Sequence, residues 1–398
     1  MQFRQRISWL IRAALQASEC SNSPSGAGVS TAGTSPGSSA GGSSRSISSG
    51  DNPASGGSPA GAGSFAARSG MSGTPVQSQV GLDASAEAGA GALVPDGGVG
   101  ESQEASADAA SAPFCTPGDA GDGKYTLTGD AAPPEWKLMP GVTAGKPTPS
   151  ASFLSTTFGL HFPYIIYTSA NYVSGQPAVF LLFGDGISTY LADSGFHAAT
   201  VLDNLTAAGD IPPTVALFID PPSDGGDPAT VRVATYDPPT QKYPTFLMTE
   251  IIPQVITGKY SISTDPDAWA LIGYRASGGQ GWNDIWKLPD NFHKFIGNSA
   301  SYGAANVAMY GNVDWVSIIS GSPKRDIRAS NTTCLNDLMD QRGSWLTTIT
   351  NVAMALSAKG NPWRLMVGSN GHYPPIDGER DFPDSPRWMF QGCKFAPN

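Results

Sequence analysis

The chain has 398 residues, with 48 glycines, 33 prolines and a formal net charge of -10 at neutral pH. An acidic chain is not expected to bind nucleic acids or anionic membrane surfaces, because both attract basic faces. The length allows two or three domains, but glycine is concentrated in the first part of the chain, so we expect the folded part to be much shorter than the whole.

Residues 1–20 have the features of an interrupted export signal, since Arg12 breaks a short apolar run that follows two arginines. Cys20 precedes a polar tract, as at a lipoprotein cleavage site, although Glu19 stands where a small residue is expected. We therefore expect an extracytoplasmic protein that is periplasmic, surface-anchored or secreted, and lipid attachment at Cys20 stays an open alternative. No later stretch is long and apolar enough to span a bilayer.

Residues 21–112 are rich in glycine, serine, alanine and proline and have almost no aromatic side chains, which predicts a disordered linker. Residues 113–398 have the composition of a folded domain. The cysteines lack metal-ligand spacing, which makes a zinc site improbable. We expect neither a metal nor a cofactor. In an exported chain, a disulfide between Cys115 and Cys393 would join the two ends of the folded region, but the sequence does not fix the pairing.

In chain order, the folded part alternates apolar runs with helical patterns. Two segments rich in β-formers come first, and continuous apolar runs then predict buried strands. The expected strands are 153–158, 162–167, 178–183, 215–219, 268–272, 295–298 and 363–367, with a short segment at 327–330, and the first two are expected to form an antiparallel pair. The expected helices are 198–208, 245–255, 281–286 and 345–358. This alternation predicts an α/β fold, a mainly parallel sheet with helices on both faces, whose site lies beyond the carboxyl ends of the strands.

The stretch 273–279 (G-Y-R-A-S-G-G) follows a buried strand and precedes a helix, as in a nucleophile elbow. Centring the motif on Arg275 places small residues two before and two after, but a guanidinium cannot attack as a hydroxyl does. Centring it on Ser277 supplies the hydroxyl but places Arg275 where a small residue is needed. Centring it on Ala276 satisfies neither requirement, and an ordinary turn with packing glycines is a further alternative.

An acyl-transfer site also needs a base, a carboxylate and donors for the oxyanion. His372 follows a late strand between glycine-rich residues and is the candidate base. Asp337 is the candidate acid, with Asp340 in reserve, and a solvated acidic turn is the alternative. Backbone N–H groups of Asp185, Gly186 and Ala276 are the candidate oxyanion donors.

Several segments together resemble the esterase D and enterochelin-esterase-like branch of the α/β-hydrolases, which includes feruloyl esterases. Residues 180–186 (F-L-L-F-G-D-G) are similar to its Y-L-L-H-G-D-G segment, and 201–205 with 209–213 are similar to its V-L-D-N-L and G-x-I-P-P segments. Residues 343–345 and 354–356 also match, as does the tyrosine-aspartate pair at 236–237. The similarity extends from about residue 133 to the C-terminus.

The resemblance implies an α/β-hydrolase fold and a serine carboxylic ester hydrolase acting on a small-molecule or polysaccharide-linked ester. It places the family acid at Asp337, the family histidine at His372 and the family nucleophile at Arg275. Two hypotheses follow. Either Ser277 acts as nucleophile with His372 and Asp337, or the protein is a catalytically degenerate hydrolase that binds a ligand or serves at the cell surface.

Overall fold

A computed structural model describes residues 115, 122–192, 195–236, 239–303, 313–340, 343–371 and 377–394. The expected signal at 1–20, the expected linker at 21–112 and His372 all lie outside these ranges. Within the described residues, no helix combines the length and the apolar character needed to cross a bilayer.

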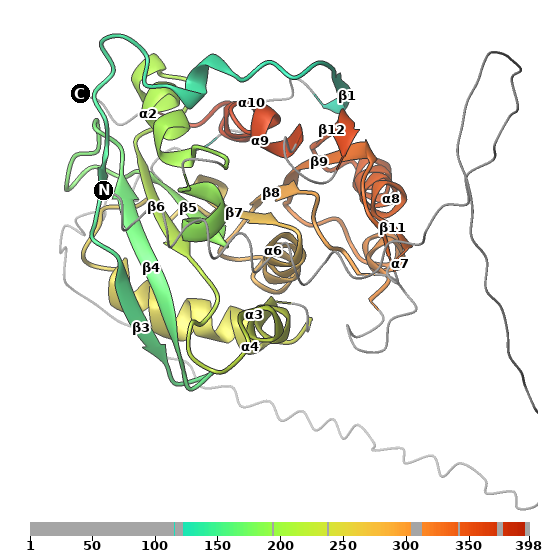
Figure 1. Ribbon diagram of the computed structural model, residues 1–398, viewed down its shortest axis with the longest axis horizontal. Coiled ribbons are helices and arrows are strands. Elements are labelled where there is room, and N and C mark those ends of the chain that lie inside the picture. The colour runs from blue at the N-terminus through green and yellow to red at the C-terminus, as the bar shows by residue number, and fades with distance from the viewer. Residues whose placement is uncertain are drawn as a thin grey trace, which may run out of the picture. The chain divides into compact units, whose positions relative to one another are not determined.

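The centre of the domain is a ten-stranded sheet in the order β1-β12-β9-β8-β7-β5-β6-β4-β2, with β3 paired to β4 (Figure 1). Its strands are β1 (Gly123–Leu127), β2 (Lys146–Pro147), β3 (Ala151–Ser155), β4 (Leu160–Thr168), β5 (Val179–Gly184), β6 (Thr214–Ile219), β7 (Trp269–Tyr274), β8 (Lys294–Asn298), β9 (Arg328–Asn336) and β12 (Trp363–Gly371). The strands β10 (Met339–Asp340) and β11 (Gly343–Ser344) form a separate antiparallel pair.

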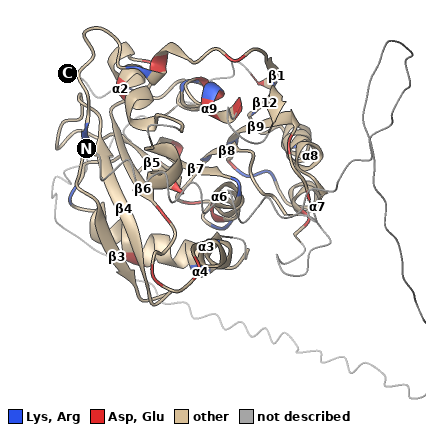
Figure 2. Cartoon of the chain, in the orientation of Figure 1, with Lys and Arg blue, Asp and Glu red and all other residues tan. Residues whose placement is uncertain are grey.

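Seven neighbouring strands from β6 to β1 are parallel, and β4 runs antiparallel to β6. The expected mainly parallel sheet and the expected antiparallel pair at its start are therefore confirmed. The central strands β5, β6 and β7 carry no charged residue and appear tan throughout (Figure 2). Strands without charges can be buried on both faces, as a parallel sheet between helices requires.

Helices cover both faces of the sheet and define two apolar cores. One face packs against α4 (Lys242–Thr245), η4 (Phe246–Ile251), α5 (Ile252–Val255), α6 (Ala276–Lys287), α7 (Trp315–Gly321) and α8 (Trp345–Ala358). The other face packs against α2 (Ala198–Ala208), α9 (Asp377–Asp381) and α10 (Asp384–Met389). Alternate residues of β5 enter opposite cores, since Leu182 belongs to the first and Leu181 to the second.

The short segment expected at 327–330 is in fact the start of a nine-residue strand, because β9 continues to Asn336. The sequence S-N-T-T after Ala329 is polar and does not look like a buried strand. These side chains are nevertheless buried and bonded: Ser330 Oγ lies 3.1 Å from Ser385 Oγ, and Thr332 Oγ1 donates to Asn298 Oδ1 over 2.9 Å. Strand β12 likewise runs past its expected end at Val367 to Gly371.

Some elements have no counterpart in the expectations from sequence, notably β1, α3 (Pro228–Tyr236), α7, α9 and α10. The disulfide between Cys115 and Cys393 forms in the structure and links a residue well ahead of β1 to the segment after α10. Cys334 is buried and carries a free thiol.

Candidate active-site crevice

The turn between β7 and α6 is a sharp bend centred on Arg275. This residue has φ 56° and ψ -119°, a backbone conformation that residues other than glycine rarely adopt. Its N–H donates to the carbonyl oxygen of Asn298 on β8 over 3.2 Å. The geometry is the strand-turn-helix arrangement of a nucleophile elbow, and the bend falls on Arg275.

Small residues around the bend are required by close backbone contacts. A Cβ atom on Gly273 would overlap the backbone oxygen of Ser277, and one on Gly279 would overlap that of Ser301. The glycines therefore allow the start of α6 to approach both its own preceding strand and the segment after β8.

Ser277 lies inside the first turn of α6 and is 3% exposed. Its hydroxyl donates to the carbonyl oxygen of Tyr274 over 2.9 Å and accepts from the N–H of Tyr274 over 3.0 Å. A Cβ atom on Gly184 would lie 2.7 Å from the Cβ of Ser277, so this side chain packs against the end of β5.

The segment after β5 begins with Asp185 in a left-handed conformation, φ 52°. Its N–H, a candidate oxyanion donor, donates to the hydroxyl of Tyr236 over 3.2 Å. Its carboxylate, 3% exposed, forms a two-point ion pair with Arg232, at 2.9 Å to Nε and 2.6 Å to Nη2. Arg232 and Tyr236 are one turn apart on α3, so a single helix fixes both the backbone and the side chain of Asp185.

Gly186 begins a short π-helix, η3 (Gly186–Tyr190), directly over β6. A Cβ atom at Gly186 would lie 2.6 Å from the Cα of Phe218, so only glycine fits there. The next two amides, of Ile187 and Ser188, donate to the carboxylate of Asp220 over 2.9 and 3.1 Å. Burial and the nearby charge of Asp185 raise the pKa of Asp220 to about 7, although these two amides counteract the shift.

Asp337 follows the end of β9 and is half-buried. One carboxylate oxygen accepts from Ser299 Oγ over 3.0 Å and from Thr333 Oγ1 over 2.7 Å, while the other accepts from the N–H of Leu338 over 2.8 Å. The carbonyl oxygen of Asn298 accepts from the N–H of Arg275, and the neighbouring Ser299 donates to Asp337. The end of β8 therefore contacts both the bend and the candidate acid. Asp340, the reserve acid, accepts from the indole nitrogen of Trp345 over 3.1 Å.

Strand β12 ends at Gly371, so the chain reaches His372 at the same edge of the parallel sheet, but His372 itself is outside the described residues. The other histidines lie elsewhere. His161 pairs with Asp224 on the surface at 2.6 Å, His293 lies 3.2 Å from Asp267, and His197 precedes α2.

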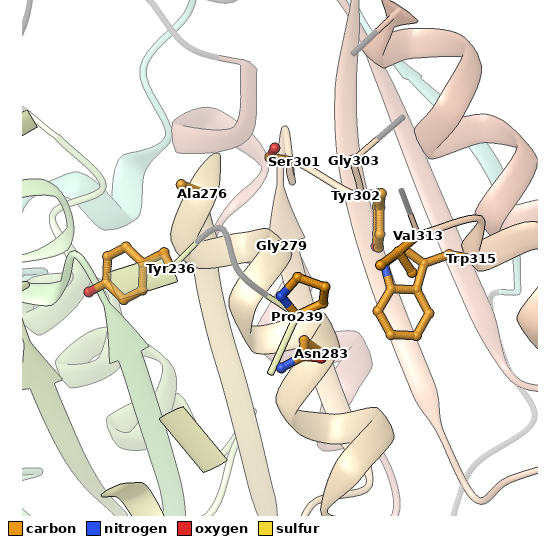
Figure 3. Close-up of a pocket in the computed structure, with 10 residues that line it drawn as sticks. All are labelled: Tyr236, Pro239, Ala276, Gly279, Asn283, Ser301, Tyr302, Gly303, Val313 and Trp315. Carbon is orange, nitrogen blue, oxygen red and sulfur yellow. The ribbon is translucent and has the colours of Figure 1, made fainter. Parts of the chain in front are cut away.

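A pocket opens beside the first turns of α6 (Figure 3). Tyr236 lies on one side of the helix start, and Tyr302 and Trp315 lie on the other. Ala276, Gly279 and Asn283 of α6 line the side between them. In the part of the chain that the structure describes, no group of three or more His, Cys, Asp or Glu side chains could hold a metal ion.

Sequence reasoning placed Arg275, Ser277, Asp337, Asp185, Gly186 and Ala276 in segments that the structure brings to one edge of the sheet. It missed Arg232 and Asp220. Arg232 precedes Tyr236 by four residues, which is helical spacing, and this spacing was the available signal.

The strand order and the bend after β7 define the class of this domain as an α/β-hydrolase fold. It resembles a ferulic acid esterase with 17% identity and a TM-score of 0.50, over 63% of this chain and 99% of that one. A mutant of the feruloyl esterase module from Clostridium thermocellum, complexed with sinapinate, matches with 15% identity and a TM-score of 0.51, over 69% and 98% of the two chains.

The ferric enterobactin esterase from Salmonella typhimurium matches with 15% identity and a TM-score of 0.51, over 66% of this chain and 62% of that one. No protein-family model matches the sequence, and no curated protein matches it. At these identities the likeness is one of fold, and it confirms the fold that the sequence resemblance implied.

Proposed function

We propose that this protein binds a carboxylate-bearing ligand in the crevice of an α/β-hydrolase fold and does not hydrolyse esters. The observation that carries the proposal is the bend itself, where Arg275 adopts φ 56° and ψ -119° while the Ser277 hydroxyl is bonded to the backbone of Tyr274. The residue at such a bend is the one whose side chain a hydrolase presents to its substrate.

The chemistry of arginine explains why binding replaces turnover. A nucleophile must lose a proton to a base before it attacks, and a guanidinium stays protonated at every accessible pH. The same group forms two parallel hydrogen bonds to a carboxylate, with a fixed planar geometry. At the bend, Arg275 therefore suits the recognition of an acid better than the cleavage of an ester.

The pocket beside α6 supports an aromatic acid as the ligand. Tyr236, Tyr302 and Trp315 line it. Ala276 also lines it, and this residue directly follows Arg275 in the sequence. Sinapinate, the compound bound in the feruloyl esterase module, combines a carboxylate with an aromatic ring. We take aromatic carboxylates of this kind as the ligand class.

Titration of the protein with sinapinate, followed by calorimetry, tests the proposal. We expect binding that weakens about tenfold or more in Arg275→Gln, which removes the charge but keeps most of the side-chain length. Arg275→Lys is the matched control, because it keeps the charge and should retain part of the affinity. Equal affinities for wild type and Arg275→Gln would contradict the proposal.

The alternative is an esterase that uses Ser277, His372 and Asp337, with Ala276, Asp185 and Gly186 near the oxyanion. The esterase neighbours in fold favour this alternative. It requires the Ser277 hydroxyl to leave its two bonds with Tyr274. Hydrolysis of a short-chain nitrophenyl ester by wild type that disappears in Ser277→Ala would support it.

An extracytoplasmic location is part of the proposal. The disulfide between Cys115 and Cys393 supports it, because such bonds persist in oxidising compartments. A fusion of the full chain to alkaline phosphatase, which is active only outside the cytoplasm, should give active phosphatase. An inactive fusion would contradict the export of this chain.

A further inference from the structure

A group of buried polar side chains lies under the start of α6, on the side that faces β5. Gln280 is 2% exposed, Asp284 1% and Tyr243, from α4, 3%. Gln280 Nε2 donates to Asp284 Oδ1 over 2.5 Å. Among the described residues, Gln280 Oε1 has no hydrogen-bond partner. Burial raises the pKa of the Tyr243 hydroxyl, which makes no well-aligned hydrogen bond, although the Tyr236 hydroxyl lies close enough to oppose that shift as a hydrogen-bond partner. A buried polar atom that makes no hydrogen bond destabilises the fold, so Gln280 Oε1 requires a donor.

These three side chains border one small cavity. The polar and glycine lining also includes Gly184, Tyr236, Ser277 and Gly281, and the apolar side is formed by Leu182, Leu271 and Ile272. The cavity has a volume of about 10 Å³. A cavity needs roughly this much space to hold one water molecule, so a larger ligand does not fit.

Asp284 can contribute a hydrogen-bond donor when its carboxyl is protonated. Burial raises its pKa well above the usual range, and the bond from Gln280 and the charge of Lys287 oppose that effect only in part. A protonated Asp284 carboxyl has an O–H group to donate, as does the Tyr243 hydroxyl, whereas Gln280 Oε1 can only accept. Two donors and one acceptor facing the same space match a water molecule, which accepts two hydrogen bonds and donates two.

We propose that this cavity is a binding site for a single water molecule that accepts from Asp284 and Tyr243 and donates to Gln280. The site joins α6 to α4 directly beneath the bend, because Ser277 and Gly184 form part of its wall. The bound water would thus support the packing of β5 against α6, whose ends carry Asp185 and Arg275. This inference is independent of whether the crevice binds or cleaves its ligand.

A high-resolution crystal structure of the full chain tests the site directly. We expect one spherical density peak within about 2.7–3.2 Å of Asp284, Gln280 Oε1 and the Tyr243 hydroxyl. No peak there, or a peak with the coordination and short distances of a metal ion, would overturn the proposal. So would a direct hydrogen bond from Tyr243 to Gln280 or Asp284 that closes the space.

Infrared spectroscopy gives a second test that needs no crystals. A protonated carboxyl has a C=O stretching band that a carboxylate lacks, and comparison with Asp284→Asn identifies the band of Asp284. We expect this band at neutral pH, and we expect Tyr243→Phe to shift it because the water loses one donor. Tyr302→Phe, at a buried tyrosine bonded instead to Asn331, is the matched control and should leave the band in place. A missing band, or one that Tyr243→Phe does not move, would overturn the assignment.

Discussion

The Ser277 hydroxyl donates to the carbonyl oxygen of Tyr274 over 2.9 Å and accepts from the N–H of the same residue over 3.0 Å. The serine thus ties the start of α6 to the last residue of β7. Both bonds must break before this hydroxyl can reach a substrate, whereas the backbone at Arg275 already has the conformation that presents a side chain.

Replacing Ser277 with alanine should therefore affect stability and not catalysis. We expect Ser277→Ala to lower the free energy of unfolding by about 1–3 kcal/mol, because it leaves the buried N–H of Tyr274 without this acceptor. Denaturant unfolding measures this loss. Ser357→Ala on α8 is the control and should change stability little, since alanine suits a helix position. A Ser277→Ala variant as stable as wild type would contradict this role.

Glu250 holds the turn between β3 and β4. Its carboxylate accepts from Ser155 Oγ over 2.7 Å, from Thr156 Oγ1 over 2.6 Å and from Thr157 N over 2.8 Å. Burial alone would raise the pKa of Glu250, but these hydrogen bonds outweigh it and lower the pKa to about 2. The ionised form is therefore the one that stabilises the fold.

Glu250→Gln should lower the free energy of unfolding at neutral pH by about 1–3 kcal/mol. Because the folded pKa lies below that of an unfolded chain, this contribution is present above about pH 4.5 and is lost as the pH falls towards about 2. The difference between wild type and variant should shrink over that interval in denaturant unfolding. A constant difference would contradict the assignment.

Asp220 should give the opposite dependence on pH. Its folded pKa, raised to about 7 by burial and by Asp185, lies above that of an unfolded chain, so its neutral form stabilises the fold and this contribution is lost as the pH rises. We expect Asp220→Asn to gain about 2–3 kcal/mol relative to wild type between about pH 5 and about pH 8. Chemical denaturation at both pH values measures the gain, and a gain of zero would exclude the raised pKa.

The disulfide joins Cys115 to Cys393, which are separated by 278 positions in the sequence. Replacing both cysteines with serine should lower the free energy of unfolding by about 2–4 kcal/mol, since the unfolded chain is then less constrained. Thermal unfolding with and without a reducing agent checks this expectation. The agent should destabilise wild type and leave the double variant unchanged, and equal effects on both would argue against this pairing.

The regular parts of the fold could be predicted from local patterns. Helix α8 begins and ends at its expected residues because Ser344 caps it, accepting from the N–H of Thr347 over 3.2 Å. Helix α2 ends as expected at Gly209, which adopts φ 77°. In both helices the signal lies within a few residues of the boundary.

Elements with buried charged residues could not be predicted from local patterns. Helix α9 has the sequence D-G-E-R-D, which is typical of a solvated turn, yet each of its residues is buried. Arg380 pairs with Asp377, and Arg364 of β12 pairs with Asp381. Such burial depends on partners that only the folded chain brings together.

The candidate site also has features that the sequence indicated and features that only the folded chain shows. The sequence indicated a bend within 273–279 and a place for Asp337 after a late strand, but it left the register of the bend open. Arg232 donates to the Asp185 carboxylate and the Asp185 N–H donates to the Tyr236 hydroxyl, so these bonds join α3 to the end of β5, and no local pattern specifies them. The orientation of Ser277 could not be predicted either, because it depends on which residue occupies the bend. If the motif were shifted by two residues, Ser277 would occupy the bend and Arg275 would not.

The rate of nitrophenyl acetate hydrolysis by purified wild type, Ser277→Ala and Arg275→Ser tests the central claim most directly. If Arg275 occupies the nucleophile position, wild type and Ser277→Ala should both hydrolyse the ester no faster than buffer, and Arg275→Ser should acquire a measurable rate. Hydrolysis by wild type that Ser277→Ala abolishes would contradict the account.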